Sequence, residues 1–288
     1  MRIVTHNGHF HADELLAVAT LLIKFPDAEV VRSRDEAVIG SADIVVDVGL
    51  SYDPAKFQFD HHQVGGAGVR ENGVPYASFG LIWKEYGEEI AGGSEEARII
   101  EEKLAMPIDA GDNGVDLYQP TIGDVREYSL GDFFESFAEQ AESMEDYDRN
   151  FFEALTHARG LIRREIEDAK NTARDWREVQ KIYDSSEDKR IIVLPRHAKW
   201  KRVLISTEAV YVVYPRPNGS WSSQVVPEDS NTYKAKKMFP EPWAGLVSRE
   251  LAAASGVADA IFCHKAGFLV GAESREGAIA LARKALEN

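Results

Sequence analysis

Two short apolar segments near the start of the chain, separated by a helical pattern, constrain its fold most. Ile3-Val4 and Ile44-Val45-Val46-Asp47-Val48 are typical of strands, and the second is continuous enough to be buried on both faces. Between them, apolar residues recur at helical spacing over 12–25, and Glu29 to Arg32 predicts a further strand. This alternation predicts an α/β fold whose N-terminal part is a parallel sheet with right-handed crossovers.

The middle of the chain is strongly polarised in charge. Helical patterns at 76–86 and 95–106 are followed by a segment, 127–148, with eight acidic residues and no basic one. The next segment, 159–177, carries six basic residues. Two solvated helix faces that pair with each other would explain this pattern. The alternative is a connecting helical arm whose basic side faces phosphates.

A second domain is expected after the polar stretch 184–188, where the pattern changes. Strands are predicted at 190–194, 202–206, 209–214, 221–226, 259–264 and 268–272, and helices at 244–254 and 276–286. We therefore expect three parts: a catalytic domain over 1–125, a helical connector over 126–185, and a smaller α/β domain with a mixed sheet over 186–288.

Composition excludes several classes of protein. The 288 residues carry a formal net charge of −15, which excludes a general basic coat for duplex DNA but leaves a local basic groove open. The single cysteine, Cys263, excludes an internal disulfide framework and a four-thiolate zinc site. No apolar run approaches the ~20 residues of a membrane span, and the N-terminus lacks a signal-peptide pattern. We expect a cytoplasmic protein with no membrane partner.

Histidines are rare in this chain and strongly clustered. Of eight in total, His6, His9 and His11 lie in one short window, and His61 and His62 in another. Imidazoles gathered in this way most often bind metal or transfer protons. The first window follows a predicted strand, and ligands of open α/β sheets bind where parallel strands end.

Carboxylates accompany both histidine windows. The turn Asn7-Gly8 would let His6 and His11 converge with Asp13, although Asp13 alone would be taken for a helix N-cap. Asp47 ends an apolar strand, where an unpaired carboxylate is costly to bury. Asp60 precedes His61 and follows 57–59, whose alternation suggests an edge strand. Asp109 and Asp112 lie in 108–114, a segment that on its own is more typical of a turn.

These groups together predict a dinuclear metal site. Mixed oxygen and nitrogen ligands favour Mn²⁺, Mg²⁺, Fe²⁺ or Zn²⁺ over Ca²⁺. There are too many ligands for one ion, whereas two ions about 3.5–4 Å apart with a bridging carboxylate would use them. Asp47 is the candidate for that bridge. Such a pair activates water and holds the oxygens of a phosphoryl group, so the expected reaction is metal-assisted hydrolysis.

The same residues resemble the DHH phosphoesterase superfamily, which includes single-strand exonucleases, oligoribonucleases and manganese pyrophosphatases. Asp47, the triplet Asp60-His61-His62 and the later acids follow that order of motifs. More narrowly, the whole chain resembles the melanocyte-proliferating-gene family of metal-dependent hydrolases. The matching stretches are Thr5 to Gly8 and Phe10 to Glu14, Asp43 to Gly49, Tyr52 to Pro54, Asp60 to Gln63, Ser78 with Gly80 to Trp83, Asp109 to Gly114, Pro240 to Trp243, and Ile261 to Ala278.

This resemblance implies a DHH-like domain with a second domain, a divalent-metal centre and 3′-to-5′ exoribonuclease activity. It implies Mn²⁺ first and Mg²⁺ second, with His62 toward the scissile phosphate and with Asp47 and Asp60 taking part in catalysis. The metal ligands that it implies are His6, His11, Asp13, Asp47, His61 and Asp112, with Asp109 as an alternative to Asp112. One departure is that His11 stands where the superfamily places an acid, and His9 has no counterpart.

The second domain contains a candidate phosphate-binding site. His264, Lys265 and Gly267 lie between two predicted strands, and Gly271 and Arg275 precede the last helix. Backbone amides at that helix start, with the Arg275 guanidinium, would suit a phosphate. Arg249 is a further candidate. An ordinary glycine turn with exposed charges is the alternative.

The expected function is that of a phosphodiesterase that trims single-stranded RNA or short oligonucleotides, as a monomer or a homodimer. One alternative is a hydrolase of small phosphoanhydrides or phosphomonoesters. Another is a non-catalytic RNA-binding protein with a vestigial metal site.

Overall fold

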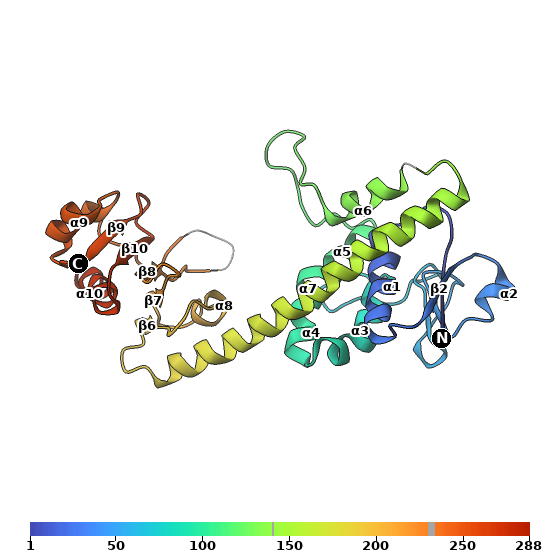
Figure 1. The fold of residues 1–288 in the computed structure, drawn as a ribbon, viewed down its shortest axis with the longest axis horizontal. Coiled ribbons are helices and arrows are strands. Elements are labelled where there is room, and N and C mark those ends of the chain that lie inside the picture. The colour runs from blue at the N-terminus through green and yellow to red at the C-terminus, as the bar shows by residue number, and fades with distance from the viewer. Residues whose placement is uncertain (140, 230–233) are drawn as a thin grey trace. The chain divides into compact units, whose positions relative to one another are not determined.

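A computed structural model describes residues 1–139, 141–229 and 234–288. The chain divides into two compact units, Met1–Lys170 and Asn171–Asn288, each with its own five-stranded sheet (Figure 1). The predicted α/β class is confirmed. The DHH-like layout and the three-part division at residues 125 and 185 stay predictions. No helix of the described residues is long and apolar enough to cross a membrane.

Unit 1 contains a mostly parallel sheet in the order β2-β1-β3-β5-β4. Strands β1, β2, β3 and β5 run parallel, and β4 is antiparallel to β5. The expected edge strand at 57–59 is therefore wrong, because Tyr52-Asp53 folds back and covers it. The elements are β1 (Arg2–Thr5), α1 (Ala12–Lys24), β2 (Glu29–Arg32), α2 (Glu36–Ile39), β3 (Ile44–Val46), β4 (Tyr52–Asp53), η1 (Pro54–Lys56), β5 (Gln58–Phe59), α3 (Ser78–Ala91), α4 (Ser94–Ile100), η2 (Glu101–Ala105), α5 (Met106–Asp112), α6 (Leu130–Ala138) and α7 (Met144–Ser185), which continues into unit 2.

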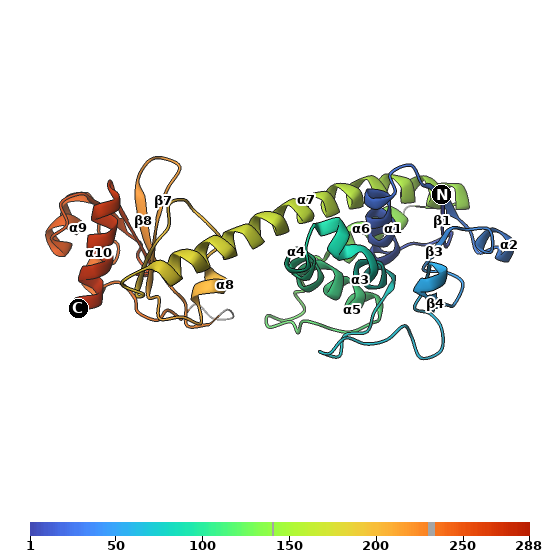
Figure 2. The ribbon, with the colours of Figure 1, turned by 90° about the horizontal axis from the view of Figure 1, so that it is seen from below.

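Helix α1 is buried over nearly its whole length. Every residue from Ala12 to Leu22 is buried, and the helix lies beside α3 (Figure 2). It begins after His11, whose backbone is extended and whose N–H donates to both carboxylate oxygens of Glu14 at 3.0 Å. It ends at Lys24, just before Phe25-Pro26, since a residue that precedes proline avoids the helical conformation. The acidic first turn of α1 is thus held inside the unit.

The segment that carries Asp109 and Asp112 is helical, so the turn expected over 108–114 is wrong. Helix α4 passes through the π-helical turn η2 into α5, which ends at Asp112. Pro107 lies at the start of α5, directly after the π-helical turn. Asp112 is the last residue of α5.

Unit 2 has a mixed sheet in the order β6-β7-β8-β10-β9, in which only β6 and β7 are parallel. Helix α10 packs against this sheet (Figure 2). The strand predicted at 202–206 is wrong: Lys201–Leu204 is a helical turn, because a short apolar run fits helix and strand equally well. The elements are β6 (Ile191–Val193), α8 (Lys201–Leu204), β7 (Tyr211–Pro215), β8 (Trp221–Val225), η3 (Glu241–Trp243), α9 (Ser248–Ser255), β9 (Ala260–Cys263), β10 (Leu269–Ala272) and α10 (Arg275–Glu287).

Adjacent phenylalanines on α7 provide a test of what holds this helix to unit 1. Phe151 is fully buried, edge-on to Phe10 with ring centroids 5.5 Å apart, whereas Phe152 is 45% exposed. We expect Phe151→Ala to lower the free energy of unfolding of unit 1 by about 3–5 kcal/mol, since it leaves a cavity. The matched variant Phe152→Ala should cost less than about 1 kcal/mol. Urea denaturation measures both, and equal losses would contradict the assigned packing.

Candidate metal centre

His6 and Glu14 form a buried pair at the end of β1. His6 Nε2 lies 2.9 Å from Glu14 Oε1 and 3.3 Å from Asp47 Oδ2. All three side chains are buried. Glu14 was missed in the sequence, although a carboxylate within a run of buried residues requires a partner.

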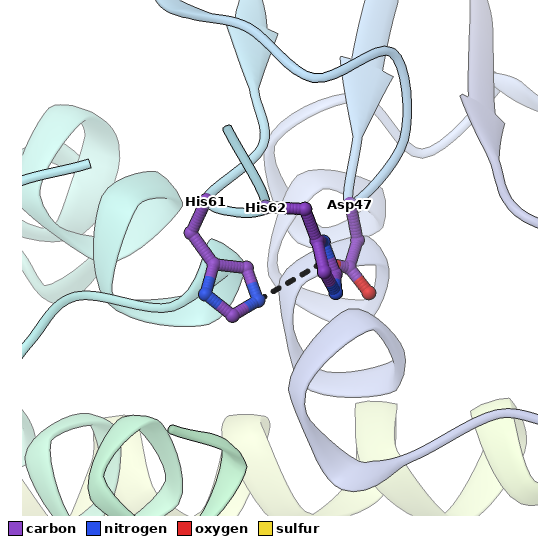
Figure 3. A group of neighbouring side chains, drawn as sticks. All are labelled: Asp47, His61 and His62. Atoms are coloured by element: carbon purple, nitrogen blue, oxygen red, sulfur yellow. Dashed lines mark ion pairs between the residues drawn. The ribbon is translucent and has the colours of Figure 1, made fainter. Parts of the chain in front are cut away.

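Asp47 lies at the centre of the site. It follows β3 with φ +57°, in the left-handed region, and Ser78 Oγ donates to its Oδ1 at 2.9 Å. Its Oδ2 faces His6, whereas Oδ1 lies 3.5 Å from His61 Nε2 and 3.4 Å from His62 Nδ1. Figure 3 shows the two imidazoles directed toward this carboxylate. One carboxylate therefore contacts histidines from two different segments.

His61 connects Asp47 to two further carboxylates. Its Nε2 lies 3.1 Å from Asp112 Oδ2, at the end of α5, and ligand atoms of Asp13, His61 and Asp112 all lie within 4.8 Å of one another. The same spacing holds for His6, Glu14 and Asp47, and for Asp47, His61 and His62.

The donor set fits divalent cations. Among the described residues, the buried His61 Nε2 has no partner in hydrogen-bond geometry despite its short distance to Asp112. A metal ion would supply that partner. Imidazole nitrogen mixed with carboxylate oxygen suits Mn²⁺, Zn²⁺ or Fe²⁺.

The first turn of α3 holds Asp13 in place. The carboxylate accepts the backbone N–H of Ser78 at 3.0 Å and of Phe79 at 2.7 Å. Asp13 therefore does not cap its own helix, which was the alternative left open by the sequence. Burial, together with the nearby charges of Asp112 and Asp47, raises the pKa of Asp13 well above its usual value.

The two buried histidines are strongly basic. Burial alone would lower the pKa of His6, but hydrogen bonds to Asp47 and Glu14 raise it to about 10. Burial likewise opposes protonation of His61, and Asp112 and Asp47 raise its pKa to about 11. Burial would raise the pKa of Asp47, but the nearby imidazoles of His6 and His61 hold it below its usual range.

Two predicted ligands, His11 and Asp109, belong to none of the three groups of ligand atoms described above. His11 is exposed, with its ring centroid 5.0 Å from that of His9. Asp109 is buried, but its oxygens accept Gly80 N at 2.9 Å and Arg70 Nη2 at 2.7 Å. The coordinating role predicted for each of these residues stays a prediction.

Asp60 positions His62. Its Oδ1 lies 2.8 Å from His62 Nδ1 and accepts the backbone N–H of His62 at 3.1 Å, and its Oδ2 accepts Leu50 N at 2.6 Å. Asp60 is fully buried, whereas the His62 side chain is 54% exposed. The arrangement fixes one ring nitrogen and leaves the other for a ligand.

The residues of the predicted phosphate-binding site lie in unit 2. His264 and Gly267 form the tight turn between β9 and β10, where Gly267 N donates to His264 O at 2.7 Å, and Lys265 is exposed. Gly271 lies within β10, and a Cβ there would be 2.6 Å from the Phe262 ring. Arg249 is exposed on α9.

The start of α10 is already bonded within the protein. Arg275 is exposed in its first turn. Asp259 Oδ2 accepts the backbone N–H of Ser274 at 2.9 Å, and Ser274 Oγ accepts Gly277 N at 2.9 Å. This helix start therefore offers a phosphate fewer donors than the sequence suggested.

Comparison with known proteins relates the whole chain to one family. The model of a family described as "Uncharacterised protein family (UPF0160)" matches residues 2–286. The MYG1 protein of Saccharomyces cerevisiae is 32% identical over 327 aligned positions, covering 99% of this chain and 95% of the relative. The human protein named MYG1 exonuclease is 31% identical over 323 positions, covering 99% and 85%. The MYG1 protein of Schizosaccharomyces pombe is 30% identical over 320 positions, covering 100% and 98%.

Metal binding should release protons from His6 and His61. With pKa values of about 10 and 11, both imidazoles are protonated at pH 8, and coordination requires an unprotonated nitrogen. We expect at least two protons released per protein, because Asp13, whose pKa burial raises, can add to those from the two histidines, and affinity that rises with pH between about 6 and 9. Calorimetry in buffers of different ionisation enthalpy counts these protons. His6→Gln should release one fewer, and an unchanged count would contradict the assignment.

Proposed function

The chain belongs to the uncharacterised protein family UPF0160, and from this premise we propose that it is a divalent-metal-dependent phosphodiesterase. The proposed substrate is single-stranded RNA or a short oligonucleotide, shortened from its 3′ end. Relatives from human, mouse and cow carry the name MYG1 exonuclease. The observation that most supports the proposal is that Asp47 directs its two oxygens to two separate histidine–carboxylate groups.

The proposed centre would hold two divalent ions, with manganese preferred to magnesium. His6 and Glu14 would serve one ion, Asp13, His61 and Asp112 the other, and Asp47 both. When bound, such ions activate water at neutral pH and stabilise negative charge on phosphoryl oxygens.

His62 is proposed to contact the scissile phosphate. Asp60 fixes its Nδ1 side, so the half-exposed ring can present its other nitrogen to a phosphate oxygen and stabilise developing charge. In unit 2, His264, Lys265, Arg249 and Arg275 are proposed to bind phosphates of the oligonucleotide, with Gly267 and Gly271 shaping the backbone there. A cytoplasmic location stays a prediction, as does the expectation of a monomer or a homodimer.

Asp47→Asn tests the centre directly. The amide keeps the shape of the side chain but removes the charge shared by both groups, so we expect hydrolysis to fall on the order of a thousandfold or more. The assay is cleavage of labelled single-stranded RNA with added Mn²⁺, and chelation by EDTA should also stop it. Asp53→Asn, in the exposed pair with Lys56, is the matched control and should retain full activity. Undiminished cleavage by pure Asp47→Asn would refute the role of Asp47.

The same assay separates the alternative functions. A 3′-to-5′ exonuclease converts 5′-labelled RNA into a descending ladder and releases the label of 3′-labelled RNA as a mononucleotide at once. Preferential hydrolysis of pyrophosphate or a phosphomonoester would indicate a small-molecule hydrolase instead. RNA binding without cleavage in the presence of metal would indicate a non-catalytic protein.

Asp60→Asn tests the positioning of His62. A neutral amide holds the His62 ring more weakly than a carboxylate does, so we expect kcat to fall about 10- to 100-fold, the range for residues that support a metal site. The number of bound metal ions should not change, because neither Asp60 nor His62 belongs to the proposed ligand set. Loss of bound metal with the loss of activity would show that Asp60 acts on the centre itself.

A further inference from the structure

A small hairpin between His62 and α3 is anchored by one buried cation, Arg70. An isolated bridge pairs Val69 with Pro75, and Arg70 N donates to Val74 O at 2.9 Å. Most of the hairpin is exposed, but only 6% of the Arg70 side chain is. The Arg70 side chain therefore extends from this exposed hairpin into the interior of unit 1.

Each of the three nitrogens of the Arg70 guanidinium donates a hydrogen bond. Nε donates to Glu101 Oε1 at 2.5 Å, Nη2 to Asp109 Oδ2 at 2.7 Å and Nη1 to Pro75 O at 3.0 Å. Its planar face lies 4.0 Å from the centre of the Tyr76 ring. Three segments thus converge on one side chain: the hairpin, η2 and α5. A lysine has the same charge but cannot make these bonds in one plane.

The contact between Asp109 and α3 is closely fitted. Gly80 N donates to Asp109 Oδ1 at 2.9 Å. A Cβ at Gly80 would lie 1.8 Å from Asp109 Oδ2 and 2.4 Å from Arg70 Nη2, so only glycine fits here. The contact between Asp109 on α5 and Gly80 on α3 therefore fixes the separation between these two helices.

That separation determines where the candidate ligands lie. Asp112 is one helical turn beyond Asp109 on α5, and Asp13 is bonded to Ser78 N and Phe79 N, immediately before Gly80. A ligand atom of His61 lies within 4.8 Å of one in each of these two carboxylates. A shift of α5 relative to α3 would separate Asp112 from Asp13 and His61.

We propose that Arg70 and Asp109 form a positioning pair that sets the spacing of Asp13, His61 and Asp112, and that Asp109 acts through Arg70 and Gly80 rather than as a ligand. This inference rests on the proposed metal centre. It assigns a role to Arg70, which no sequence motif marks, and a different one to Asp109.

Mn²⁺ binding to the full chain, followed by the electron paramagnetic resonance of free Mn²⁺ at 25 °C, tests the pair without relying on turnover. We expect Arg70→Lys to weaken binding about 10- to 100-fold, as is typical when support of a metal ligand is lost. Arg98→Lys, in the exposed pair with Glu102, is the matched control and should bind normally. If Arg70→Lys lowers only the melting temperature and leaves Mn²⁺ affinity unchanged, the positioning role is overturned.

A double variant distinguishes positioning from direct coordination by Asp109. If the two residues act as one unit, Arg70→Lys with Asp109→Asn should weaken Mn²⁺ binding no more than the stronger single variant. Losses that multiply would show that Asp109 binds metal on its own and would overturn the proposal. Should Arg70→Lys not fold, Glu101→Gln, which removes a partner of Arg70 and leaves Asp109 unchanged, is compared with Arg98→Lys. Weaker Mn²⁺ binding by Glu101→Gln supports the positioning role, and unchanged binding overturns it.

Asp112→Asn separates failure of this inference from failure of the proposed function. If Asp112→Asn leaves Mn²⁺ binding intact, the metal centre itself is wrong, and the inference falls with it. If Asp112→Asn weakens binding and neither Arg70→Lys nor Asp109→Asn does, the centre stands and only the positioning pair is overturned.

Discussion

Three carboxylates from distant parts of the chain are held by the first turn of α3. Asp13 accepts the N–H groups of Ser78 and Phe79, Asp47 accepts the Ser78 hydroxyl, and Asp109 accepts Gly80 N. The N–H groups of a first helical turn have no partner within the helix and carry partial positive charge. They therefore offset part of the cost of burying these acids together. In the sequence Ser78-Phe79-Gly80, the serine hydroxyl donates to Asp47, and the glycine has no side chain to block the approach of Asp109.

This turn does not balance all of the buried negative charge. Glu14 is also buried beside Asp47, and Asp112 lies next to His61. The neighbouring carboxylates raise the pKa values of His6 and His61, and the protons that these imidazoles hold compensate part of the negative charge. A cation bound at the same place would take over that compensation and release the imidazole nitrogens as ligands. The same electrostatic imbalance explains both the basic histidines and the fit to divalent ions.

The sequence was most informative where one segment carried the signal. The strands at Ile3-Val4 and Ile44 to Val46 followed from apolar runs, and a meeting of imidazoles and carboxylates followed from where parallel strands end. The particular residues that the structure brings together, His6, Asp13, Asp47, His61 and Asp112, belonged to the set that the family resemblance implied. Glu14 was hidden because its need for a partner appears only when the whole helix is buried. Arg70 could not be found, since its partner Asp109 is 39 residues away and no local pattern links them. At the start of α10, Asp259 likewise meets Ser274 across 15 residues.

The turn that follows Asp47 is strained, and the buried Asp60 fixes it. Asp47 and Leu50 both have positive φ values, +57° and +55°, and Gly49 between them has +94°. Non-glycine residues in this region cost on the order of 1 kcal/mol each and persist only when their surroundings fix them. Asp60 provides that constraint, because Oδ2 accepts Leu50 N while Oδ1 contacts the His62 ring. One buried carboxylate thus links the turn that carries Asp47 to the imidazole of His62, so a change at Asp60 affects both.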